Sequence, residues 1–224
     1  MIEVDRIMIE DYHIELIQMM ESAGRNLADL ARSRFLGGAP RGKKVVILAG
    51  AGGNGGGALV AARRLHNWGA DVLTFPIGAF KGIPLHQFEI LQRMNIPVAD
   101  SIPLLESFEA DLLIDGIIGY SLKGAPRGIA ADLIRWANSR RIPILSLDTP
   151  SGLDVTSGQA YSPTIKASAT MTLALPKVGL LHSNAMEYVG ELYLADIGVP
   201  PNLYTALGLN VPPLFEEQEI IRVE

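Results

Sequence analysis

The chain has 224 residues, of which 48% are hydrophobic and 19% charged, so a single domain over residues 1–224 can bury a sizeable core. Its formal net charge of -5 excludes a broad surface for the phosphate backbone of nucleic acids. The absence of cysteine excludes disulfide bonds, thiolate-bound metals and a cysteine nucleophile.

No segment of the sequence predicts a membrane span or a secretory signal. The apolar runs all fall short of the roughly 18 residues that a bilayer span needs. The N-terminus carries Glu3 and Asp5 where a signal peptide needs basic residues. We therefore expect a cytoplasmic protein without a membrane or nucleic-acid partner. The four histidines are scattered and lack the spacing of a zinc site.

Helix and strand patterns alternate along the chain. An apolar stripe predicts one helix over residues 4–34, which a Gly-Gly-Ala-Pro segment ends. A continuous apolar run predicts a buried strand at residues 45–49, and a glycine-rich turn at 50–57 leads into a helix over 58–68. This order predicts an α/β fold with a mostly parallel sheet that helices cover on both faces. The unit recurs, with helices expected at residues 85–94 and 128–139 and strands at 71–75, 111–115, 143–147, 169–175 and 190–195.

The two ends of the chain carry weaker signals. Residues 200–224 are punctuated by prolines and are expected to wrap the surface. The first predicted helix has more apolar residues than one buried face needs, so that they serve either the core or a dimer contact. These residues are Ile7, Ile9, Ile14, Ile17, Met19 and Met20.

Three loops that follow predicted strands concentrate glycines and polar side chains. They lie at residues 50–57, 115–124 and 148–154. In open α/β sheets, ligands bind beyond the carboxyl ends of the strands, near a switch in strand order. If the strands are parallel, the three loops converge on one edge of the sheet.

The first loop has six glycines in eight positions before a predicted helix, an arrangement whose free backbone amides favour a phosphate or pyrophosphate. Gly50, Gly52 and Gly55 match the pattern GxGxxG, which alone is weak evidence. An ordinary NAD dehydrogenase is disfavoured, because the next strand ends without the acidic residue that holds the ribose. A Walker loop is excluded by the missing Gly-Lys-Ser/Thr. The glycines alternatively serve only close packing of strand and helix.

Asp115 and Asp148 follow apolar strands, and a pair of carboxylates beside a glycine loop favours a site over two turn caps. Asn54, Asp115 and Ser151 offer only hard oxygen ligands, which suit an alkali or alkaline-earth cation better than zinc. Lys123 and Arg127 flank the second loop, where they either meet a phosphate or stay solvated.

Six ordered motifs resemble those of the YjeF N-terminal domain family, whose enzymes are NAD(P)H-hydrate epimerases. The resemblance covers nearly the whole chain. The motifs lie at residues 20–25 (MESAGR), 50–65, 115–122, 147–154 (LDTPSGLD), 169–180 and 196–200 (DIGVP).

The resemblance implies a Rossmann-like three-layer α/β/α sandwich, commonly a homodimer, that binds one potassium ion. It implies an enzyme that interconverts the R and S forms of hydrated NADH and NADPH, so that an S-specific dehydratase can repair the whole pool. Carried over by position, the potassium ligands would be Asn54, Asp115 and Ser151. The hydrated cofactor would contact Gly53, Asn54, Gly55, Gly56, Gly57, Gly119, Tyr120, Ser121, Leu122, Lys123, Gly124, Ala125 and Asp148.

The chemistry of this reaction suits one carboxyl group of tuned pKa. The reacting carbon bears a hydroxyl and neighbours the ring nitrogen. Once an acidic group protonates this hydroxyl, the nitrogen can expel it. The same group, now a base, can activate water on the other face. We assign this role to Asp148 and only a positioning role to potassium.

The sequence departs from the family pattern at the candidate site. Gly53 and Gly57 replace an Asn and an Asp of the glycine loop, and Tyr120 and Ser121 replace Thr and Gly. Two alternatives to an epimerase therefore stand. One is a non-catalytic nucleotide-binding or scaffold domain of the same fold, as in an mRNA-decapping scaffold. The other is an enzyme that acts on a different nucleotide-like metabolite.

Overall fold

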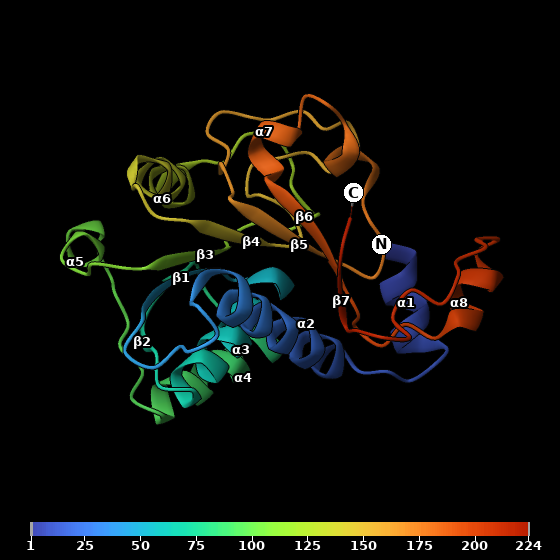
Figure 1. Ribbon diagram of the computed structural model, residues 1–224, viewed down its shortest axis with the longest axis horizontal. Helices are drawn as coiled ribbons and strands as arrows, with labels where there is room; N and C mark the ends of the chain where they lie inside the picture. Colours follow the sequence, from blue (N-terminus) through green and yellow to red (C-terminus); the bar gives the residue numbers. More distant parts are fainter. Residues whose placement is uncertain (1, 224) are drawn as a thin grey trace.

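A seven-stranded sheet, with helices on both of its faces, forms the centre of the computed structural model, which describes residues 2–223 (Figure 1). The strands lie in the order β2-β1-β3-β4-β5-β6-β7, and all neighbours are parallel except β6 and β7. The predicted α/β sandwich with a mostly parallel sheet is confirmed. The strands are β1 (Lys44–Gly50), β2 (Asp71–Ile77), β3 (Leu112–Gly116), β4 (Ile144–Leu147), β5 (Ala169–Leu173), β6 (Glu191–Ala195) and β7 (Ile220–Arg222).

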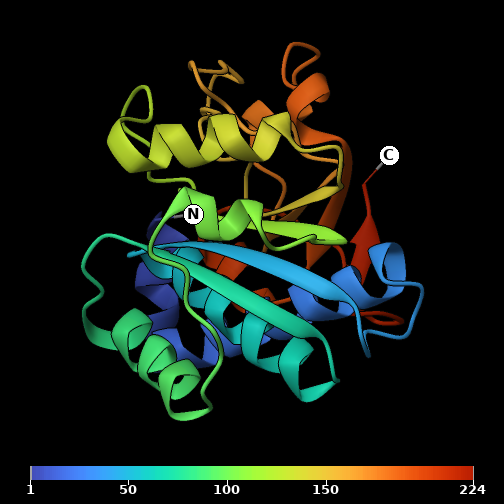
Figure 2. The same cartoon turned by 90° about the vertical axis from the view of Figure 1, so that its left-hand side faces the viewer.

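The helices form two layers, and a view along the sheet shows one on each side of it (Figure 2). On one face lie α2 (Leu16–Leu30), α3 (Gly53–Asn67) and α4 (Gly82–Arg93). The other face carries α5 (Ile102–Glu106) and α6 (Gly128–Ser139). Shorter elements are the π-helix Ala31–Phe35, the 3-10 helix Val178–Leu181, α1 (Ile2–Glu10), α7 (Met186–Val189) and α8 (Pro201–Ala206).

Two hydrophobic cores fill the space between the sheet and its helices. Side chains alternate along β1, so that Val45, Ile47 and Ala49 enter one core while Val46 and Leu48 enter the other. This is why the strand is a continuous apolar run. Strand β1 also separates β2 from β3, and the chain crosses from one side of it to the other after β2. The carboxyl ends of β1 and β3 therefore form the switch point where ligands bind in such sheets.

The single helix predicted over residues 4–34 is wrong, because the structure breaks it into α1, α2 and a π-helical turn. His13 adopts the left-handed region with φ 54°, which a continuous helix cannot contain. Gln18 Oε1 accepts the Glu15 backbone N–H at 2.7 Å and so starts α2 afresh. The break lets α1 pack Val4 and Met8 into a separate cluster at the end of the sheet.

Other boundaries differ from the predictions by a few residues, and two of the differences change how the fold is understood. Helix α3 starts at Gly53 instead of residue 58, because the second half of the glycine-rich loop is its first turn. The chain end does more than wrap the surface, since β7 joins the sheet through Ile221 opposite Leu194. Among residues 2–223, no helix is both long and apolar enough to cross a membrane.

The surplus apolar residues of the N-terminal segment belong mostly to the core. Ile7, Met19 and Met20 are buried, and Ile14 and Ile17 are half-buried. The exception is Ile9, which is 38% exposed and faces the pocket described below. The dimer contact considered for this segment remains a prediction.

Candidate functional site

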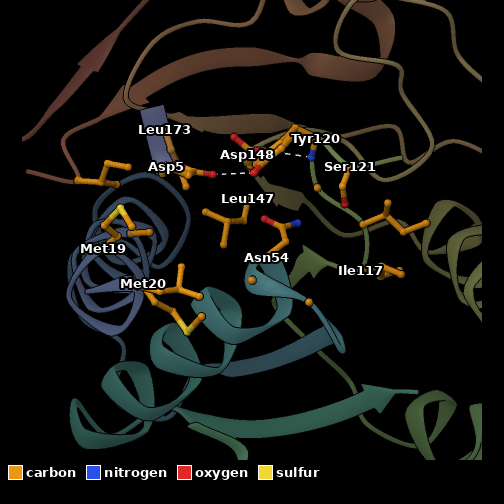
Figure 3. Close-up of a pocket in the computed structure, with 18 of the residues that line it drawn as sticks. Asp5, Met19, Met20, Asn54, Ile117, Tyr120, Ser121, Leu147, Asp148 and Leu173 are labelled. Carbon is orange, nitrogen blue, oxygen red and sulfur yellow. Dashed lines mark hydrogen bonds between the residues drawn. The ribbon is translucent and has the colours of Figure 1, made fainter. Parts of the chain in front are cut away.

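A cavity of about 470 Å³ opens at the carboxyl ends of β1, β3, β4 and β5, beside α1 and α2 (Figure 3). Most of its wall is apolar and comes from α1, α2 and the strand ends. Its polar side chains are few, which is typical of sites for organic ligands. They are Asp5, Asn54, Tyr120, Ser121 and Asp148.

The three loops singled out in the sequence converge at this cavity, as the parallel sheet requires. Seven of the thirteen residues expected to contact the substrate line it, namely Gly53, Asn54, Gly57, Gly119, Tyr120, Ser121 and Asp148. Outside its lining lie Gly55, Gly56, Leu122, Lys123, Gly124 and Ala125. Lys123 and Arg127 are exposed, away from the wall.

The glycine loop divides into packing and lining positions. A Cβ on Gly55 would lie 2.6 Å from the carbonyl carbon of Gly50, and one on Gly56 would lie 2.5 Å from Met20 Sδ. Gly55 is required by the close approach of α3 to the backbone of β1, whereas at Gly56 the obstacle is the flexible end of the Met20 side chain, which would have to shift. Around Gly53 a Cβ would meet nothing within 4 Å, so its backbone is open to a ligand. The packing interpretation therefore holds most strictly for Gly55 and does not hold for Gly53.

Asp115 is completely buried at the end of β3 and accepts four hydrogen bonds. The hydroxyl groups of Ser146 and Ser151 donate at 2.8 and 2.6 Å, and the backbone N–H groups of Ser151 and Ile117 donate at 2.9 and 3.2 Å. Burial raises the pKa of the Asp115 carboxyl, and these hydrogen bonds oppose the rise. Within residues 2–223 no Lys or Arg forms an ion pair with it.

Ser151 bonds to the loop after β3, and Asn54 lies against the same loop at Gly119. Ser151 Oγ accepts the Ile118 N–H at 2.9 Å, and a Cβ on Gly119 would lie 3.2 Å from Asn54 Cβ. Both polar atoms of the Asn54 amide are buried without a hydrogen-bond partner in the described part of the chain. Such a group needs a partner, which a ligand, an ion or a water molecule would supply. Residues 2–223 contain no cluster of three or more His, Cys, Asp or Glu side chains suited to a metal.

Asp148 follows β4 in a strained turn. Its φ is 66°, and the backbone N–H of Thr149 donates to Leu147 O at 2.8 Å across it. A left-handed conformation is uncommon for a residue other than glycine and clusters at functional sites. The backbone N–H of Asp148 donates to Met171 O at 2.7 Å, which fixes the turn to β5. The side chain is 5% exposed and faces the cavity.

Lys177 is the partner of Asp148 that sequence reasoning missed. Its ammonium donates to Asp148 Oδ1, and the Tyr120 backbone N–H donates to Oδ2 at 3.3 Å. The signal was present, because Lys177 lies in the segment 169–180 that carries the resemblance. The sequence around Lys177 does not indicate that it pairs with Asp148, because 29 residues separate the two.

Tyr120 lies across the polar end of the cavity and contacts α1 (Figure 3). Its hydroxyl donates to Asp5 Oδ2 at 2.6 Å. Burial raises the pKa of Tyr120, and the negative charges of Asp5 and Asp148 add to that rise. Asp5 was not predicted, because 115 residues separate it from Tyr120 and nothing around it in the sequence marks a site.

Comparisons with known proteins identify the family. Residues 16–179 match the model described as YjeF-related protein N-terminus. A Dehalogenimonas lykanthroporepellens protein named NAD(P)H-hydrate epimerase is 43% identical over 92% of this chain and 83% of its own length. The bifunctional NAD(P)H-hydrate repair enzyme Nnr of Moorella thermoacetica is 34% identical over 93% of this chain, which spans only 41% of that enzyme.

A solved structure supports the same assignment of fold. The crystal structure of the yeast protein ynu0 superposes with a TM-score of 0.83 at 24% identity, and the match covers 99% of this chain and 96% of the yeast chain. The family model matches most of the chain, and the first of these relatives is similar over nearly all of it. This protein belongs to the family of YjeF-related proteins, and the matched residues correspond to the N-terminal domain of that family.

Proposed function

We propose that this protein is an isomerase that interconverts the R and S epimers of hydrated NADH and NADPH. The observation that carries the proposal is the buried carboxyl group of Asp148, which faces a largely apolar cavity in a chain 43% identical to an NAD(P)H-hydrate epimerase. The identity over 92% of the chain favours this function over a scaffold domain or an enzyme for another metabolite.

Asp148 is the group that transfers the proton. Its carboxyl group protonates the hydroxyl on the carbon next to the ring nitrogen, which expels water and leaves a planar cation. The carboxylate then takes a proton from water that adds to the opposite face, so that the proton count of the site is restored. Apolar residues such as Met19, Leu147 and Leu173 line the cavity and limit the access of other water.

The open end of the glycine loop is the proposed place for the phosphates of the cofactor. Gly52 and Gly53 are exposed at the N-terminus of α3, where backbone amides and the helix dipole favour an anion. The other predicted contacts in the loop after β3, residues 119–125, remain part of the proposal.

Potassium is the proposed ion of this site, and Asn54, Asp115 and Ser151 would hold it. The residues fit such an ion: Asn54 Oδ1 is buried without a partner, and the Asp115 carboxylate is buried without a basic neighbour among residues 2–223. Oxygen ligands of this kind suit a hard cation. When bound, the ion would balance the charge of Asp115 and fix the loop that carries Tyr120.

The Moorella relative supports a coupling to a second repair activity. Its name describes a bifunctional repair enzyme, and this chain matches only 41% of its length. We propose that the second activity is an S-specific dehydratase, which consumes one of the two epimers. A homodimer and a cytoplasmic location also remain proposals, and sedimentation of the purified chain at micromolar concentration tests the first of them.

A coupled assay tests the function. The protein is added to an R/S mixture of hydrated NADH with potassium and excess S-specific dehydratase, and the absorbance of NADH is followed. We expect full recovery of NADH, faster than the spontaneous epimerisation of the R form. Asp148→Asn is expected to reduce the rate to that of the spontaneous reaction, while Asp132→Asn, at an exposed ion pair on α6, is expected to behave as wild type. Recovery that stops at the S fraction would refute the proposal.

A further inference from the structure

We propose that Lys177 is a positioning residue for Asp148, whose carboxylate it orients and whose negative charge it balances during proton transfer. This inference rests on the proposed function, because it assigns Lys177 a part in that reaction. It concerns a buried charged group that the mechanism above leaves unused. The side chains of Lys177 and Asp148 are only 6% and 5% exposed.

The hydrogen bonds of Lys177 leave its ammonium no freedom. An ammonium has three donors, and here all three are used. One goes to Asp148 Oδ1, one to Thr172 Oγ1 at 3.0 Å and one to Leu173 O at 3.0 Å. The last two partners belong to β5, a rigid strand of the sheet. Lys177 therefore ties the carboxylate to the framework of the fold.

The chain is bent to bring Lys177 to this place. Just after β5, Ala174 adopts a φ of 62°, and the Leu175 N–H donates to Leu173 O at 2.7 Å. The same conformation occurs at Asp148 just after β4, the neighbouring strand. The turns at Asp148 and Ala174 lie side by side. The turn at Ala174 directs the chain back, so that Lys177 reaches the side chain of Asp148.

The pairing makes the two oxygens of Asp148 different. Oδ1 is held by the lysine, whereas Oδ2 has only the 3.3 Å bond from the Tyr120 N–H among residues 2–223. Oδ2 is therefore the oxygen available to a substrate hydroxyl. When the carboxyl group gives its proton to that hydroxyl, the charge it acquires is next to an ammonium, and the positive charge appears on the substrate ring. The total charge of the site does not change.

A purely structural ion pair is the competing explanation, since removing one partner of a buried pair is strongly destabilising in any protein. The two explanations differ in kinetics. A positioning residue acts on the proton-transfer step, so its loss lowers kcat and changes KM little. A structural residue acts on the folded fraction, so its loss lowers the free energy of unfolding and leaves the kcat of the folded enzyme unchanged.

The test compares three variants in the coupled assay, at a temperature where thermal unfolding shows each to be folded. Lys177→Met removes the charge and keeps the length, Lys177→Arg keeps the charge, and Lys166→Met removes an exposed lysine that pairs with Glu187. We expect Lys177→Met to lower kcat by about 10- to 100-fold, within the range of acid–base effects, with KM changed less than about threefold. Lys177→Arg is expected to recover part of kcat, and Lys166→Met to match wild type.

The outcomes separate this inference from the function on which it rests. An inactive wild-type protein overturns both. An active wild type with an equally active Lys177→Met overturns the inference alone, as does equal impairment of Lys177→Met and Lys177→Arg. A rise in KM at constant kcat would also overturn it, because it would place Lys177 in substrate binding.

Discussion

Alanine substitution at two glycines of the same helix turn tests how the site is built. At Gly55 the added Cβ would lie 2.6 Å from the carbonyl carbon and 2.7 Å from the nitrogen of Gly50. Carbon atoms pack favourably only at about 3.5–4.0 Å, so the start of α3 would have to move away from β1 by about 1 Å. At Gly53 the same methyl group meets nothing within 4 Å, and the φ is not left-handed.

The expected changes in the free energy of unfolding have opposite signs. Overpacking costs about 1–3 kcal/mol where side chains can yield. At Gly55 the obstacle is backbone, so we expect Gly55→Ala to lose about 3 kcal/mol or more, which corresponds to a fall of about 6–12 °C in Tm for a chain of this size. Gly53→Ala is expected to gain up to about 1 kcal/mol, because alanine restricts the unfolded chain and favours a helix.

Urea and thermal unfolding, followed by far-ultraviolet circular dichroism, measure both changes. Gly53→Ala serves as the matched control, since it makes the same chemical change two residues away. If Gly55→Ala were as stable as wild type, α3 would not approach β1 as closely as the structure has it. If Gly53→Ala were strongly destabilised, the division of the loop into packing and open glycines would be wrong.

Three further predictions concern charged groups. Hydrogen bonds from Arg34 lower the pKa of Glu191 from 4.5 to about 2, so its contribution to stability is complete above pH 4.5 and is lost as the pH falls toward 2; Glu191→Gln should therefore lose less stability over this range in acid titrations followed by fluorescence. Tyr120→Phe removes the donor to Asp5 and should lower the free energy of unfolding by about 1 kcal/mol, measured in urea. Unchanged stability would mean that this hydrogen bond does not contribute to the free energy of unfolding. A hundredfold excess of potassium over its dissociation constant should stabilise the wild type by about 2.7 kcal/mol at constant ionic strength, and the same shift in Asp115→Asn would argue against the proposed ligand set.

Strands β1 to β6 could be predicted from sequence because each is short and mostly apolar, whereas β7 was not predicted. Burial on both faces of a parallel sheet leaves no alternation of polar residues, and runs such as residues 45–49 therefore stand out. The parallel order of β1 to β6 also places their carboxyl ends on one edge of the sheet. For that reason the meeting of Asn54, Asp115 and Asp148 at one edge of the sheet followed from the sequence.

What could not be predicted depends on contacts between distant residues. The apolar spacing continues across residues 11–15, and only the tertiary packing of α1 shows that the helix breaks there. The partners Lys177 and Asp5 reach the site through bonds that span 29 and 115 residues. Likewise, a string of glycines does not say which of them pack and which face a ligand. Gly53 and Gly55 differ only in what surrounds them.

The aspartate at position 148 is better explained by chemistry than by the fold. A glycine there would adopt a φ of 66° without strain, whereas a side chain in the left-handed region costs of order 1–3 kcal/mol. Neutral residues at both position 148 and position 177 would also bury no charge, and burying a carboxylate with its ammonium partner rarely adds to stability. The turn would therefore fold more easily without this ion pair. Asp148 lies beside a cavity with one oxygen fixed by Lys177, and among residues 2–223 its other oxygen accepts only a long bond from a loop amide, which is the arrangement that the proposed proton transfer to a bound ligand requires.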